Sequence, residues 1–182
     1  MKKLILTIST IILVASIALC QDDQGIGDAY IGQMNSFSLF GSQKVFLEND
    51  LTLIQTGANN QAQITQSQDQ AGAHSASVFQ YGIREEVILN QSGANNQASF
   101  LQVGGKNKIN IVQRGNFISS NVIQLGFENT VLQELEGNNK NYTIIQRGNN
   151  WGVIELGFNP DNPGYKIEQT GQVGVTMTIE HH

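Results

Sequence analysis

The sequence predicts an all-β protein, a cross-β solenoid of about six two-strand rungs whose strands form two facing parallel sheets. The first observation is a motif that recurs every eleven residues. The second is the alternation of apolar and polar residues before each copy of that motif. The third is composition, because 19 Asn, 20 Gln and 19 Gly make up about a third of the 182 residues. Stacked β architectures are rich in these residues.

The recurring motif is Gln-x-Gly. Its copies begin at Gln55, Gln80, Gln91, Gln102, Gln113, Gln124, Gln146 and Gln169. Four successive steps from Gln80 to Gln124 are each eleven residues long. Gln66 lies eleven residues after Gln55 without the glycine, Leu135-Glu-Gly137 fills the slot before Gln146, and Glu155-Leu-Gly157 is a shortened unit. This register predicts that the Gln residues hold equivalent places in successive strands.

The residues before each Gln alternate as a β-strand requires. Leu51, Leu53 and Gln55 share one parity, and the later units repeat the pattern. The other parity is mostly Thr, Ser, Asn and Gln, with apolar exceptions such as Ile54, Val112 and Ile123. A period of two places one set on a dry face and the other on a mixed outer face. The Gly and Asn residues that recur every eleven residues interrupt any apolar periodicity of 3.6, so no helix is expected in this region.

Stacking follows because one such unit cannot bury its apolar face alone. A strand of about five residues and a tight Gly-x-x-Asn turn reverse the chain, so two units of about 22 residues in total form a rung. Stacked rungs would place strands about 4.8 Å apart in two parallel sheets around a narrow core. Residues 45–182 are expected to form this solenoid.

Equivalent amides should then form ladders through the stack. A buried Gln without a partner costs ~1–3 kcal/mol, whereas a stacked Gln can donate to its copy in the next rung. The expected ladder residues are Gln55, Gln66, Gln80, Gln91, Gln102, Gln113, Gln124, Gln146, Gln169, Asn60, Asn96, Asn107 and Asn129. The expected turn glycines, which need positive φ or close backbone approach, are Gly57, Gly82, Gly93, Gly104, Gly115, Gly126, Gly137, Gly148 and Gly171.

Residues 1–20 are expected to be a cleaved secretory signal. Lys2 and Lys3 precede an apolar stretch from Leu4 to Leu19, and a polar segment follows at once. Two alternatives remain open: a single membrane-spanning helix, and a lipidated Cys20. Cleavage before Gln21 would leave the mature chain without cysteine, so neither a disulfide nor a thiol nucleophile would be available.

Composition and motifs argue against several other functions. A formal net charge of −5 lacks the basic footprint of a nucleic-acid binder. His74 lies in an apparent loop, and the pair His181-His182 lacks a third metal ligand. No phosphate loop, calcium repeat or Ser/His/Asp arrangement is present. We therefore expect no catalytic residue, no metal site, no cofactor and no enzymatic activity.

Charged residues are expected outside the core. The carboxylates of Glu85-Glu86 and Glu134/Glu136 fall at turns or on the outer parity, which predicts solvated or edge-blocking charges. Arg114 and Arg147 lie between Gln and Gly on the outer face. They are expected to act as gatekeepers against uncontrolled stacking. Trp151 is expected to occupy a turn and to pack there.

The repeat resembles that of the curlin family, whose pattern is approximately Ser/Asn-x5-Gln-x-Gly-x-x-Asn-x-Ala-x3-Gln. Two copies carry its full core, Gln55-Thr-Gly57-Ala-Asn-Asn60-Gln-Ala62-Gln-Ile-Thr-Gln66 and Gln91-Ser-Gly93-Ala-Asn-Asn96-Gln-Ala98-Ser-Phe-Leu-Gln102. Other copies depart from it, with Ile118, Lys140 and Trp151 in the Asn slot. The resemblance covers about residues 45–180.

The resemblance implies a secreted structural protein that builds curli-like amyloid fibres for biofilm matrix and adhesion at the bacterial cell surface. It also implies partners: further copies of the chain, a second curlin subunit, and an outer-membrane secretion pore with accessory proteins. The same resemblance implies that residues 21–44 are the segment read by that pore. Whether the chain is a major subunit or a nucleator stays open, and the alternative is a monomeric β-solenoid with a ligand-binding or enzymatic role.

Overall fold

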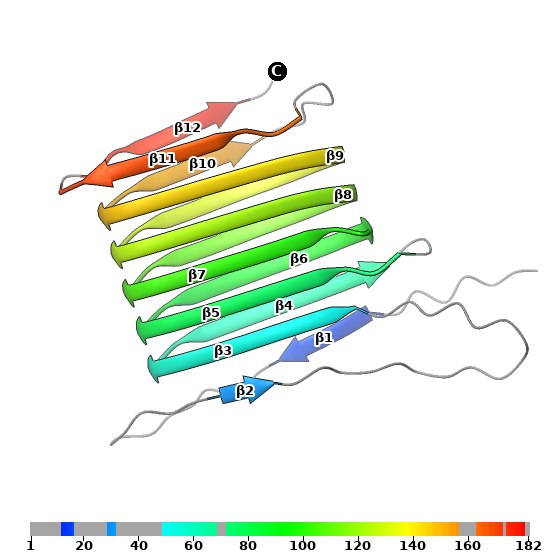
Figure 1. The fold of residues 1–182 in the computed structure, drawn as a ribbon, viewed down its shortest axis with the longest axis horizontal. Coiled ribbons are helices and arrows are strands. Elements are labelled where there is room, and N and C mark those ends of the chain that lie inside the picture. The colour runs from blue at the N-terminus through cyan, green and yellow to red at the C-terminus, as the bar shows by residue number, and fades with distance from the viewer. Residues whose placement is uncertain are drawn as a thin grey trace, which may run out of the picture.

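The computed structural model describes residues 12–16, 29–31, 49–68, 72–156, 163–172 and 174–180, and it is all-β in these ranges (Figure 1). The strands are β1 (Ile12–Ser16), β2 (Ala29–Ile31), β3 (Asp50–Ala58), β4 (Gln61–Gln68), β5 (Ser75–Ile83), β6 (Glu86–Ala94), β7 (Gln97–Gly105), β8 (Lys108–Phe127), β9 (Thr130–Asn149), β10 (Gly152–Leu156), β11 (Lys166–Gly171) and β12 (Thr176–Glu180). The described residues contain no helix that is both long and apolar enough to span a membrane.

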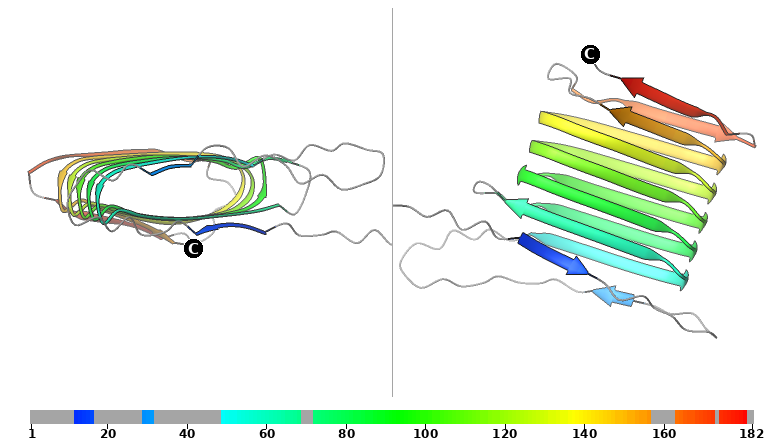
Figure 2. Two further views of the ribbon diagram at one scale, coloured as in Figure 1. Left: turned by 90° about the horizontal axis from the view of Figure 1, so that it is seen from below. Right: turned by 180° about the vertical axis from the view of Figure 1, so that it is seen from behind.

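The strands wind into a β-solenoid of about 5 turns with two parallel, in-register faces. Sheet I contains β3, β5, β7, residues 119–127 of β8, residues 141–149 of β9, and β11. Sheet II contains β4, β6, residues 108–116 of β8, residues 130–138 of β9, β10 and β12. Viewed along the stack, the chain traces a flattened loop (Figure 2). The predicted solenoid of two facing parallel sheets is confirmed.

The two strands before the solenoid run against it. β1 pairs antiparallel with β4 from Gln63 to Ser67, and β2 pairs antiparallel with β3 from Leu53 to Gln55. β1 falls within the expected signal, while most of residues 1–44, Cys20 included, lie outside the described residues. Cleavage of residues 1–20 and the role of residues 21–44 stay predictions.

The inward parity forms the core between the sheets. Leu53, Val78, Phe100, Val122 and Ile144 stack in register through sheet I, and all are 0–1% exposed. Ile64, Leu89 and Ile111 form the facing column in sheet II. Burying one such apolar side chain contributes about 1.5–3 kcal/mol. Because the sheet I column continues through every rung to Ile167, this contribution grows with each rung that is added.

Candidate site of self-association: the amide ladders and the strand edges

Sheet I carries an unbroken glutamine ladder. The Nε2 atom of each Gln donates to the Oε1 atom of the next Gln toward the C-terminus. The five N···O distances, from Gln55 through Gln80, Gln102, Gln124 and Gln146 to Gln169, are 2.6, 2.9, 2.9, 2.9 and 2.8 Å. These side chains are at most 8% exposed. The ladder therefore has a direction, with an acceptor at its β3 end.

The second N–H of these amides ties sheet I to sheet II. Gln80 Nε2 donates to Gln61 O at 3.0 Å, and Gln102 Nε2 donates to Glu86 O at 3.1 Å. Gln124, Gln146 and Gln169 donate in the same way to Lys108, Thr130 and Gly152. Each buried amide nitrogen from Gln80 onward thus donates twice, which removes the desolvation cost of an unpaired donor.

Sheet II has a shorter glutamine ladder. Gln66 donates to Gln91 at 2.9 Å and Gln91 donates to Gln113 at 2.8 Å. The next residue in register is Leu135, the substitution visible in the sequence, so the ladder stops there. At its other end Gln66 Oε1 is buried without a hydrogen-bond partner. An unpartnered buried acceptor costs ~1–3 kcal/mol, so this atom marks a place where a further donor would stabilise the stack.

One assignment from the motif is wrong. The sequence aligns Glu155 with the ladder glutamines, but the register pairs it with Gln133 in the core column of Ile111. Gln133 Nε2 donates to Glu155 Oε2 at 2.9 Å and to Tyr165 Oη at 3.0 Å, and Tyr165 also donates to Glu155. Burial, followed by the hydrogen bond to Glu155, raises the pKa of Tyr165 far above its usual range. The apolar core therefore becomes polar in its last rungs.

The turns that lead from sheet I to sheet II stack as a third ladder. Its members are Asn60, Glu85, Asn107, Asn129 and Trp151. The side-chain oxygen of each member accepts from the backbone N–H of the next, at 3.0, 3.0, 3.1 and 3.0 Å. Asn129 Nδ2 also donates to Asn107 Oδ1 at 3.0 Å. Three of the predicted turn asparagines thus share one column, although Glu85 separates Asn60 from the others.

The fourth predicted asparagine, Asn96, lies in the opposite turn column. Asn49 Oδ1 accepts from His74 N, and Asn96 Oδ1 accepts from Ile118 N. The Nδ1 atom of the buried His74 accepts from Asn96 N at 3.3 Å, so its Nε2 carries the proton and donates to Ser67 O at 3.0 Å. In this column His74 therefore accepts a hydrogen bond from the backbone N–H of the next rung, as the asparagine side chains do. All nine predicted turn glycines have positive φ.

The expectation that Glu85 is a solvated charge is wrong, because its side chain is buried in the turn column. Glu85 Oε2 accepts from Asn107 N at 3.0 Å, and Oε1 accepts from Asn107 Nδ2 at 3.2 Å. Burial raises the pKa of Glu85 to about 7, although both hydrogen bonds from Asn107 lower it. The neighbouring asparagines use their Nδ2 to bind a glycine carbonyl of the next rung, which an ionised carboxylate cannot do.

Stability should therefore depend on pH through Glu85. Its pKa in the folded chain lies above the ordinary value of about 4.5 for a glutamate, so the folded state binds more protons and stability falls as pH rises from about 4.5 to about 7. We expect a loss on the order of 2–3 kcal/mol across this window. In Glu85→Gln this part of the pH dependence should disappear from urea unfolding curves, while in the exposed-face control Glu86→Gln it should persist. If the free energy of unfolding changed equally with pH in both variants, Glu85 would not be the group that causes this pH dependence.

The outer surface carries exposed ion pairs. Lys106 pairs with Glu128 at 2.7 Å and Lys108 pairs with Glu86 at 3.0 Å. Arg114 pairs with Glu134, and Arg147 pairs with Glu168, whose pKa is lowered by that hydrogen bond. Pairs this exposed contribute little to stability. A gatekeeper role for the two arginines stays a prediction.

The ladders end at strands with an open side. Among the described strands none pairs with the outer edge of β11 or of β12, and both lie at the C-terminal end of the stack (Figure 1). At the other end of the stack, β2 pairs with only three residues on the outer edge of β3, and β1 pairs with five on the outer edge of β4. Unpaired backbone N–H and C=O groups at such edges are templates for another strand.

The described part of the chain holds no group of three or more His, Cys, Asp or Glu suited to a metal ion; His181 and His182 lie outside it. A family model described as the curlin associated repeat matches residues 86–115, which cover β6, β7 and the start of β8. No match was found among curated proteins or among solved structures.

Proposed function

The matched repeat and the β-solenoid fit a protein of the curlin family, and from this we propose that the chain is a secreted structural subunit that assembles into extracellular, curli-like amyloid fibres. Curlin family proteins form such fibres, and the family is not one of enzymes. The proposed roles of the fibre are biofilm matrix and adhesion. The observation that supports self-assembly best is a directional ladder that ends at open strand edges.

In the proposed contact, β11 of one copy pairs with β3 of the next, so that sheet I continues across the junction. Gln169 at one end and Gln55 at the other are equivalent in register. Gln169 Nε2 donates to Val175 O at 3.2 Å, in place of the next glutamine of the ladder. Exchanging Val175 O for Gln55 Oε1 of the next copy would extend the ladder with no loss of hydrogen bonds.

Sheet II would continue from β12 to β4. Removal of residues 1–20, which include β1, would uncover the edge of β4 next to the unpartnered Gln66 Oε1. Strand β2 would have to leave β3 as well. A protein processed in this way gains a free edge at its N-terminal rung, and edge-to-edge pairing needs both edges free.

The proposed partners follow from the same family. We expect the chain to pair with its own copies and with a second curlin subunit, after export through an outer-membrane pore that reads residues 21–44. Seeding separates the two subunit roles. A nucleator should abolish the lag of another curlin at trace amounts, whereas a major subunit should make up most of the fibre mass.

Purified protein at about micromolar concentration should assemble into fibres that bind thioflavin T and diffract at about 4.8 Å, the spacing of hydrogen-bonded strands. Growth should be seeded by preformed fibres. A protein that stays monomeric for days and melts in one sharp, concentration-independent transition would contradict the proposal. That result would favour a monomeric β-solenoid.

A further inference from the structure

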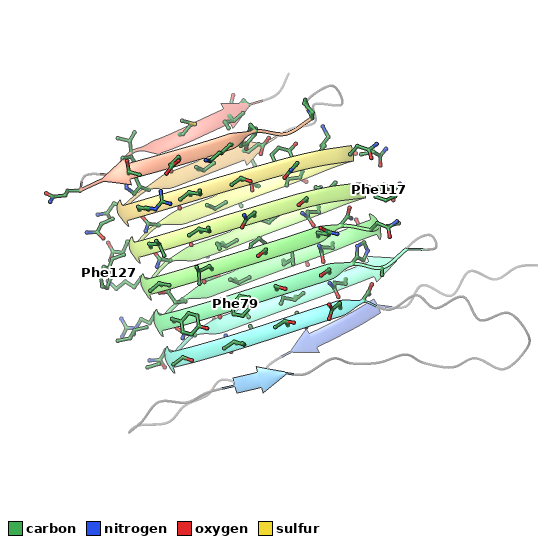
Figure 3. All side chains as sticks on the ribbon, in the orientation of Figure 1. Phe79, Phe117 and Phe127 are labelled. Carbon is green, nitrogen blue, oxygen red and sulfur yellow. The ribbon has the colours of Figure 1, made fainter. Side chains whose placement is uncertain are left out.

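The outer faces of the two sheets differ in chemistry. On sheet I the register gathers outward apolar residues into two adjacent columns. We call them the apolar strip: Ile54, Phe79, Leu101, Ile123 and Ile145 in one column, and Tyr81, Val103 and Leu125 in the other. Figure 3 shows Phe79 on this outer face. Tyr81 and Val103 are 39% and 38% exposed.

Charge on this face is confined to its two ends. Sheet I carries Asp50 at the start of β3, no outward charged side chain in its second to fourth strands, and Arg147, Lys166 and Glu168 in its last two strands. The outer face of sheet II carries six: Glu86, Lys108, Arg114, Glu134, Glu136 and Glu180. Its apolar residues are interrupted, since Asn110 separates Ile88 from Leu132 and Glu134 separates Val112 from Leu156.

We propose that the apolar strip is a lateral interface, by which two filaments of this chain pair with the outer faces of sheet I in contact. This proposal rests on the proposed function, because it requires filaments. The chain is acidic, with a formal net charge of −5, so two copies repel each other wherever carboxylates meet. The strip itself carries no charged side chain, so two identical copies can approach there with less repulsion between like charges than at the carboxylates of sheet II.

The area of the apolar strip explains why filaments, and not single molecules, would pair. Each outward position covers roughly 4.8 Å by 6.7 Å of the sheet, so the eight residues of the strip cover about 260 Å². A stable interface needs about 800 Å² on each partner. One subunit therefore falls short, whereas about three stacked subunits supply enough area, in strips that Glu168 and Thr170 of β11 separate from one another. A two-fold axis along the fibre would bring the same strip of both filaments together.

The test compares two matched double variants, each of which changes one Leu and one Ile to Thr. Leu101→Thr with Ile123→Thr alters the strip, and Leu132→Thr with Ile88→Thr alters the outer face of sheet II. All four residues are partly exposed and point outward, and Thr suits strands. Mass per unit length of fibres, measured by scanning transmission electron microscopy, reports pairing, while thioflavin T growth and the strand reflection near 4.8 Å report assembly.

Wild-type fibres and the sheet II variant should be paired, and the strip variant should form single filaments with half the mass per length. Pairing should also survive about 1 M salt, which screens charges beyond about 3 Å. Wild-type filaments that are single overturn this proposal but leave the proposed function intact. Equal pairing in both variants, or equal loss of it, also overturns the proposal. Single filaments that bind phosphatidylcholine vesicles through the strip would assign it to lipid instead, and absence of any fibre removes both proposals.

Discussion

Gly104→Ala should prevent the chain from forming a stable solenoid, at a cost of at least about 4 kcal/mol. A Cβ atom at this position would lie 2.0 Å from the backbone oxygen of Gly126 in the next rung, and φ of Gly104 is +131°. Neither the clash nor the backbone conformation can relax without separating the two rungs, because the obstructing atom is backbone. Circular dichroism and urea titration should show lost β-structure, and fibres should not form.

The adjacent glycine supplies the control. In Gly105→Ala the closest contact of the new methyl group would be the ring of Phe127, at 3.0 Å, with the Ile83 backbone oxygen at 3.4 Å, an ordinary van der Waals distance. The Phe127 residue is 57% exposed, so its ring is free to move aside. Gly105 is not among the positive-φ residues. Its substitution should therefore cost less than about 1 kcal/mol and leave fibre growth intact. A milder effect of Gly104→Ala than of Gly105→Ala would contradict the close stacking of the turns.

Gln102→Glu should destabilise the chain by at least about 4 kcal/mol at pH 7. The side chain of Gln102 is fully buried, and its Nε2 donates to both Gln124 Oε1 and Glu86 O. A carboxylate cannot donate, so two acceptors would face a buried negative charge. The loss should shrink as pH falls, because protonation removes the charge and restores one donor. Urea unfolding at pH 4 and at pH 7 measures both effects.

Gln97→Glu is the matched control, since the Gln97 side chain is exposed on the outer parity of β7. The same change of an amide to a carboxylate should there stay within about 0.5 kcal/mol. If both variants lost the same stability, the effect would arise from net charge and not from the buried ladder.

The register of the ladders could be predicted from the sequence because the repeat has a constant length. The eleven-residue step from Gln80 to Gln124 assigns alternate units to opposite sheets, and Leu135 marks where the sheet II ladder stops. The glutamine-to-glutamine hydrogen bonds then follow from stacking. What an eleven-residue period cannot supply is the path of the chain after its spacing changes. The unit after Gln146 is shorter than eleven residues, so the repeat predicts the wrong column for Glu155.

Glu85 shows a different reason for error. It stands three residues after Gly82, in the slot that Asn60 occupies after Gly57, so the signal was present in the motif. The residue type predicts the opposite, because two adjacent carboxylates, Glu85 and Glu86, are expected to be exposed to solvent. Position in a repeat outweighed residue type here, because the column of backbone N–H groups needs an acceptor in every rung. In the opposite column His74 likewise supplies an acceptor, for the backbone N–H of Asn96.

The apolar strip required the structure. The sequence shows outward apolar residues such as Ile54 and Ile123 as scattered exceptions. Only the pairing of units about 22 residues apart places these two residues and Leu101 in one column of sheet I, with the outward charges of that sheet at its two ends. Periodicity along the chain predicts which side of a strand faces out, but neighbours across strands decide whether a patch forms.

Spin–spin distances within fibres test the central claim, that each chain folds on itself as an in-register solenoid. In a Cys20→Ser background, labels on Ser99→Cys and Asn121→Cys lie on residues paired between adjacent strands, about 4.8 Å apart along the stack. A label on Ser99→Cys alone meets its copy only six strands away, at about 29 Å. The account predicts strong dipolar broadening in the doubly labelled chain, even after tenfold dilution with unlabelled protein, and none in the singly labelled chain. Strong broadening from the single label, lost on dilution, would mean that identical residues stack between molecules, and would contradict the solenoid.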